Sequence, residues 1–137
     1  GRQTFMRIDA AFGVVEIGNI LWTEVVARKP AATEALYLFA KHAFDLGYRR
    51  FEWKCNNRNG PSKRAALRFG FAFEGVFRQH MIVKGENRDT AWFAMLDGDW
   101  PVAGAAMEQW LSPDNFDSHG RQKRRLEQIR AGIRGRN

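Results

Sequence analysis

The sequence predicts an α/β (α+β) fold in which a mixed sheet carries helices on both faces. Residues 14–22 and 49–55 are rich in β-branched and aromatic residues, and a helical pattern over 30–46 separates them. This order indicates a β–α–β unit with parallel strands. Two further strand-like runs, 71–84 and 88–96, flank a turn and indicate a C-terminal β-hairpin.

The first half of the chain carries clear boundary signals. Residues 5–10 predict a short strand, and Gly18 within the next strand indicates a bulge or a close backbone approach. Pro30 suits the first position of a helix, because its missing N–H would be unpaired there anyway. Gly47 suits the end of that helix.

Strand 49–55 presents two chemically different faces. Alternation places Phe51, Trp53 and Cys55 on one side and Arg50, Glu52 and Lys54 on the other. Short helices are expected over 61–69, ended by Gly70, and over 101–111. The predicted order is therefore β-β-α-β-α-β-β-α.

Composition is that of a single ordinary globular domain. The chain has 137 residues, 45% hydrophobic and 27% charged. No apolar run approaches the ~18 residues that span a bilayer, so no membrane contact is expected. The single cysteine, Cys55, fits a reducing cytoplasm. His, Cys, Asp and Glu show no clustered ligand spacing, so no metal is expected.

Positive charge is concentrated at one end. Of the net charge of +7, residues 121–137 carry +6. We expect a core over 1–111, a polar linker over 112–120 and a basic C-terminal tail over 121–137. Such a tail can contact the phosphates of nucleic acid or a ribosome; a solvated terminus is the alternative. One face of the tail is helical in pattern and holds Leu126, Ile129 and Ile133.

Two motifs identify a family resemblance. Asn-x-x-Ser at 59–62 opens a short helix, and Gly-Phe-x-x-Glu-Gly at 70–75 follows it. This arrangement resembles the cofactor-binding half of the GNAT N-acetyltransferases, in particular the RimJ/RimL branch. The resemblance implies a mostly antiparallel sheet with a V-shaped splay between its central strands. It also implies acetyl-CoA as the cosubstrate.

The resemblance places the CoA pyrophosphate at residues 27–33, where GNAT proteins carry a Gln/Arg-x-x-Gly-x-Gly/Ala loop. A helix N-terminus there offers free N–H groups and the positive end of a dipole. This chain departs from the pattern at Ala27 and Pro30. Because Pro30 removes one donor, we expect phosphate binding to rely on Arg28 and Lys29. A plain helix start with two surface bases is the alternative.

The resemblance also assigns the pantetheine arm. Unpaired peptide groups at 21–23 would bind it, and Asn59 would contact it, although Asn59 also suits a helix cap. Arg64 and Arg68 add charge near the CoA phosphates. The residues expected to bind the cofactor are Leu21, Trp22, Thr23, Arg28, Lys29, Ala31, Ala32, Thr33, Asn59 and Ser62.

Two residues are candidates for catalysis by the same resemblance. The Ser62 hydroxyl would meet the leaving CoA sulfur, because Ala66 replaces the tyrosine that many GNAT enzymes use. Glu16 would help to deprotonate the amine. The alternatives are a polar residue in a first helical turn and a half-buried Glu paired with Arg or Lys. Cys55 is interpreted as a buried inert thiol.

The function that follows is transfer of an acetyl group from acetyl-CoA to a primary amine, in a ternary complex. A protein N-terminus and a small-molecule amine both fit. The resemblance covers about residues 3–111, and RimL-like proteins carry two further strands and two helices before this part. We expect the exposed sheet edge to favour a homodimer. The rival hypothesis is a truncated, non-catalytic GNAT-like module that binds RNA, a ribosome or a protein partner through its basic tail.

Overall fold

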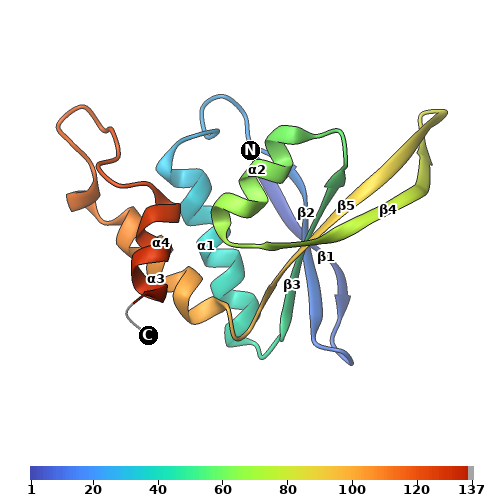
Figure 1. Cartoon of the computed structure of the whole chain (residues 1–137), viewed down its shortest axis with the longest axis horizontal. Coiled ribbons are helices and arrows are strands. Elements are labelled where there is room, and N and C mark those ends of the chain that lie inside the picture. The colour runs from blue at the N-terminus through green and yellow to red at the C-terminus, as the bar shows by residue number, and fades with distance from the viewer. Residues whose placement is uncertain (136–137) are drawn as a thin grey trace.

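The computed structural model describes residues 1–135 and contains one five-stranded sheet (Figure 1). The strands are β1 (Arg2–Asp9), β2 (Val14–Leu21), β3 (Arg50–Asn56), β4 (Ala72–Val83) and β5 (Glu86–Leu96). Their order across the sheet is β1-β2-β3-β5-β4. Only β2 and β3 are parallel, and the other neighbours are antiparallel. The predicted mixed, mostly antiparallel sheet and its C-terminal hairpin are therefore confirmed.

The helices are α1 (Pro30–Asp45), α2 (Gly60–Phe69), α3 (Trp100–Leu111) and α4 (Leu126–Arg134), with a 3-10 turn η1 at Pro113–Asn115. In the described residues these helices lie on one side of the sheet (Figure 1). The prediction of helices on both faces is therefore wrong for this part of the chain. The physical reason is that the buried core lies on one face of the sheet. The strand side chains in that core all belong to this face, and the helices pack against it.

Alternation along the central strands builds that core. Phe51 on β3 pairs with Met95 on β5 and lies beside Val15 on β2, and all three are buried. Leu36 of α1 and Phe69 of α2 belong to the same apolar cluster. Burying this face against helices is the main source of stability, because transfer of apolar surface from water drives folding.

Two predicted glycine roles are confirmed. The register of β1 with β2 shifts between the pairs Thr4–Gly18 and Arg2–Leu21, so Gly18 borders a bulge, and a Cβ there would displace the Met6 side chain. Gly70 has φ +103° and ends α2 in the left-handed conformation.

The C-terminal segment packs on the core. Leu126 and Ile129 of α4 are buried, as their shared helical face predicts. Arg130 donates from Nη1 to the carbonyl of Arg68 (2.6 Å) and from Nη2 to that of Leu67 (3.0 Å). The first bond supplies a partner for a carbonyl in the last turn of α2, and the second adds to the bond that the Leu67 carbonyl already accepts from Gly70 N. Residues 121–135 therefore include a folded helix, while Arg136 and Asn137 lie outside the described residues.

No helix among residues 1–135 is long and apolar enough to span a membrane.

Candidate functional site

The central strands part in the middle of the sheet. Parallel pairing of β2 with β3 joins Val14–Glu16 to Arg50–Glu52 and goes no further, although β2 continues to Leu21 and β3 to Asn56. This is the predicted V-shaped splay. Its physical consequence is a row of peptide groups on the facing strand edges that the other strand does not satisfy.

Aromatic rings lie on the helix side of the splay. Trp22 follows β2, and its ring centroid is 6.3 Å from that of Trp53 on β3. Phe69 of α2 lies 5.8 Å from Trp22 and 6.2 Å from Trp53. The opening is therefore bordered by apolar surface next to free backbone donors and acceptors, a combination that suits an extended chain containing amides.

The loop before α1 ends in an uncapped helix N-terminus. The carbonyl of Thr23 accepts hydrogen bonds from Val26 N and Ala27 N, and Arg28 has φ +61°. Lys29 is the N-cap residue and supplies no side-chain cap. The start of α1 thus keeps amide groups available for an anion, with the exposed side chains of Arg28 and Lys29 beside them.

Thr33 and Arg68 meet at this helix start. Thr33 is buried, and its Oγ1 accepts a hydrogen bond from Arg68 Nη1 (3.1 Å). Burial lowers the pKa of Arg68, whose guanidinium also lies 4.8 Å from the ring centroid of Trp110. Arg64 and Arg68 both line a groove of about 550 Å³ between α2 and α4. Arg68 therefore lies beside the start of α1, and the contact of Arg64 and Arg68 with the CoA phosphates stays a prediction.

Asn59 and Ser62 form the N-terminus of α2. Asn59 Oδ1 accepts the backbone N–H of Ser62 (3.1 Å), which is the cap that the alternative interpretation describes. The Ser62 Oγ accepts a hydrogen bond from the indole Nε1 of Trp53 (3.0 Å). The sequence predicts only the face of the strand on which Trp53 lies, together with Phe51 and Cys55. Nothing in the local sequence signals this bond, because it joins a strand to the following helix.

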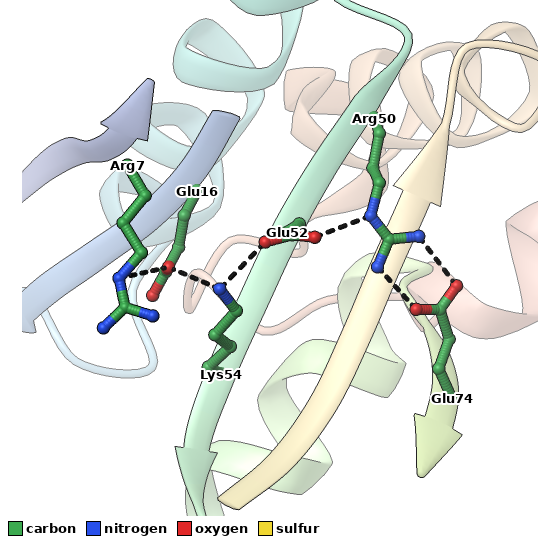
Figure 2. Close-up of polar contacts among 6 residues, drawn as sticks. All are labelled: Arg7, Glu16, Arg50, Glu52, Lys54 and Glu74. Atoms are coloured by element: carbon green, nitrogen blue, oxygen red, sulfur yellow. Dashed lines mark hydrogen bonds and ion pairs between the residues drawn. The ribbon is translucent and has the colours of Figure 1, made fainter. Parts of the chain in front are cut away.

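Glu16 lies on the opposite face, in a chain of ion pairs (Figure 2). Its Oε2 is 2.9 Å from Lys54 Nζ and 3.6 Å from Arg7 Nε. Glu16 is buried, so the alternative of a carboxylate paired with basic residues describes it correctly. Among the described residues none donates a hydrogen bond to Oε1, which leaves that oxygen for a further partner.

The ion pairs continue across β3 to β4 (Figure 2). Lys54 Nζ is 2.9 Å from Glu52 Oε2, and Arg50 bonds to Glu52 and through two nitrogens to Glu74. Burial acts to raise the pKa of Glu52, but the bonds from Arg50 and Lys54 outweigh it and lower the pKa. The bonds between Arg50 and Glu74 are the largest cause of the raised pKa of Arg50 and of the lowered pKa of Glu74.

The splay therefore connects two chemically different sides. Ser62 and Trp53 lie on the side of the helices, and Glu16 and Lys54 lie on the charged side. Cys55 is buried and free, on the helix side. Within residues 1–135 no group of three or more His, Cys, Asp or Glu side chains could hold a metal ion.

The family model described as the acetyltransferase (GNAT) domain matches residues 1–72, more than half of the chain. The chain therefore belongs to the GNAT acetyltransferase family. No curated protein matches the chain.

Solved structures agree with this family. A GCN5-related N-acetyltransferase from Brucella melitensis is 61% identical, with a TM-score of 0.93 over 94% of this chain and 59% of that chain. The microcin self-immunity acetyltransferase MccE, solved with acetyl-CoA and AMP, is 30% identical, with a TM-score of 0.59 over 65% of this chain and 49% of that one. Mycobacterium smegmatis RimJ, solved with CoA-disulfide, is 25% identical, with a TM-score of 0.63 over 73% and 48%. The chain thus spans 59% of the length of the Brucella relative.

Proposed function

We propose that this chain carries out N-acetyl transfer from acetyl-CoA to a primary amine, either a protein N-terminus or a small molecule. The observation that carries the proposal is the splay, where β2 and β3 stop pairing after Glu16 and Glu52. Free peptide groups there suit the amides of pantetheine, and the start of α1 suits the pyrophosphate. The MccE and RimJ neighbours were solved with acetyl-CoA and with CoA-disulfide.

The cofactor residues would act mainly through the backbone. Residues 21–23 would pair with pantetheine. The amides of Ala31 and Thr33 would face the pyrophosphate with Arg28 and Lys29, and Ala32, whose N–H donates to the Lys29 carbonyl (3.1 Å), would line the loop. The Thr33 hydroxyl is taken by Arg68, so the contribution of Thr33 is its N–H. Asn59 keeps its side-chain N–H₂ for pantetheine while its Oδ1 caps α2.

The two sides of the splay suggest how the reactants meet. The amine approaches from the charged side, where Glu16 Oε1 or a water bound to it takes up the proton that the amine loses. A C–N bond forms, the C–S bond breaks, and its electron pair leaves on sulfur as a thiolate. On the helix side, the Ser62 hydroxyl keeps its proton and donates a hydrogen bond to that thiolate. Glu16 returns the amine proton to solvent, and the released thiolate takes up a proton from solvent to end as a thiol. Holding both reactants in line supplies most of the rate gain, and no acyl-enzyme is needed.

Free CoA released by the purified chain tests this proposal. The thiol is followed with a chromogenic disulfide, with acetyl-CoA and a panel of N-terminal peptides and polyamines. Ser62→Ala should lower kcat about 10- to 100-fold, the scale of losing one hydrogen bond to a charged group, roughly 1.5–3 kcal/mol. Turnover that is unchanged at saturating substrate would exclude the role of Ser62.

Assembly and location complete the proposal. β1 and β4 form the sheet edges, and Ile8 (60% exposed) and Ile82 (82%) add apolar surface to them. A homodimer would cover such an edge. Light scattering at increasing concentration measures the mass of the assembly, and a constant monomer mass rejects the homodimer.

The free thiol of Cys55 supports a cytoplasmic location.

A further inference from the structure

One hydrogen bond ties the splay to the N-terminus of α2. Trp53 is the first β3 residue beyond the last residue that pairs with β2, and its indole Nε1 donates to Ser62 Oγ at 3.0 Å. The bond therefore lies where the strands begin to separate. It reaches the hydroxyl that the proposed function places beside the CoA sulfur.

The Trp53 indole is held in place by other rings. It is 3% exposed, and its ring centroid lies 5.6 Å from that of Phe71, in addition to the contacts with Trp22 and Phe69. An indole N–H can only donate, so in a buried position it needs an acceptor. Packing on several sides keeps the ring from turning, so the N–H can point in only one direction. The Ser62 Oγ lies in that direction and accepts the hydrogen bond.

We propose that Trp53 is a positioning residue, which fixes the Ser62 hydroxyl as a hydrogen-bond donor toward the departing CoA sulfur; this inference rests on the proposed function. A serine hydroxyl has one proton and two acceptor sites. The indole N–H occupies one acceptor site and leaves the proton free for another partner. Donation into Oγ also polarises the O–H bond, which makes the hydroxyl a stronger donor.

The bond itself is tested without any activity. In the chain labelled with ¹⁵N-tryptophan, Trp53→Phe identifies the Trp53 indole signal. Ser62→Ala should shift that signal in the direction of a lost hydrogen bond, and Ser62→Thr, which keeps a hydroxyl, should leave it near its original position. Trp110 provides the matched control, because its buried indole donates to Gln122 Oε1 at 2.8 Å. Its signal should not respond to either change at Ser62.

The positioning role is tested by a double-mutant cycle. Trp53→Phe should lower kcat about tenfold and change the KM for acetyl-CoA less than about twofold, since the ring packing is largely kept. In the Ser62→Ala background the same change should alter kcat less than about twofold, because Trp53 acts through the hydroxyl. Trp110→Phe should change kcat less than about twofold in both backgrounds.

Each outcome decides one question. The inference would be overturned if Trp53→Phe lowered kcat equally in both backgrounds, or if the Trp53 indole signal did not change in Ser62→Ala. The proposed function would still stand in that case, provided that the unaltered chain turns over acetyl-CoA. An unaltered chain that neither binds acetyl-CoA nor turns it over would overturn the proposed function and this inference with it. If Trp53→Phe does not fold, Ser62→Thr decides: it should keep most of kcat, and a loss equal to that of Ser62→Ala contradicts the proposal.

Discussion

Replacing Lys54 by Met removes the cation at the centre of the charged face. Its Nζ lies 2.9 Å from both Glu16 Oε2 and Glu52 Oε2, and the lysine side chain is only 7% exposed. It also lies 3.8 Å from the ring centroid of Trp92. Removing one partner of a buried ion pair costs roughly 3–5 kcal/mol, because the remaining charge stays buried without compensation.

The structure moderates this magnitude for Lys54→Met. Glu16 keeps Arg7 at 3.6 Å and Glu52 keeps Arg50 at 2.6 Å, so we expect a loss of about 2–3 kcal/mol in the free energy of unfolding. The entropy of unfolding is roughly 2.1 cal/mol/K per residue, or about 0.29 kcal/mol/K for this chain. The expected decrease in Tm is therefore about 7–10 °C.

The loss should also depend on pH. The bonds from Arg50 and Lys54 outweigh burial and hold the pKa of Glu52 below the ordinary range of a glutamate. A carboxyl with a lowered folded pKa stabilises the fold above its unfolded pKa, and this contribution disappears as pH falls through the folded pKa. Without Lys54 the folded pKa rises, so the deficit of Lys54→Met should be full at pH 7.5 and smaller at pH 4.

Urea unfolding of both proteins at the two pH values measures this deficit. Lys41→Met is the matched control, since Lys41 is 46% exposed and pairs with Asp45 on the surface of α1. Its cost should stay below about 0.5 kcal/mol. A deficit for Lys54→Met no larger than that of the control, or an equal deficit at pH 7.5 and pH 4, would refute the reasoning.

Two further substitutions test other parts of the structure. Arg68→Met should weaken acetyl-CoA binding about 5- to 20-fold, the scale of a charge-assisted hydrogen bond. The same change should leave the affinity for acetyl-pantetheine unchanged, because this acetyl donor lacks the nucleotide phosphates. Equal weakening for both donors in a titration would contradict this role. Ile129→Ala should cost about 2–4 kcal/mol in urea unfolding, because the side chain is 1% exposed. An unchanged midpoint would mean that α4 does not stabilise the core.

The elements themselves follow from local patterns. Alternation and β-branched content mark β2 and β3, and Pro30 and Gly47 limit α1, which the structure places at Pro30–Asp45. Turn chemistry around Gly85 predicts the hairpin of β4 and β5. These signals are local in sequence, so a single chain is enough to recognise them.

Other features depend on how distant segments meet. Lys54 approaches Glu16 only because the β2–β3 register brings together residues 38 positions apart. The family resemblance predicts a role for Ser62, but its bond to Trp53 requires the placement of α2 against β3. The order of strands and helices also does not determine which face each helix covers, so the one-sided packing could not be derived from it.

The central claim is that the splay and the start of α1 bind acetyl-CoA. Isothermal titration of the purified chain with acetyl-CoA, with CoA as the comparison, tests this most directly. We predict binding of both ligands with a Kd on the order of micromolar, within the usual range of enzymes for their substrates. Absence of binding up to about millimolar ligand would contradict the account, because the fold would then be present without its cofactor site.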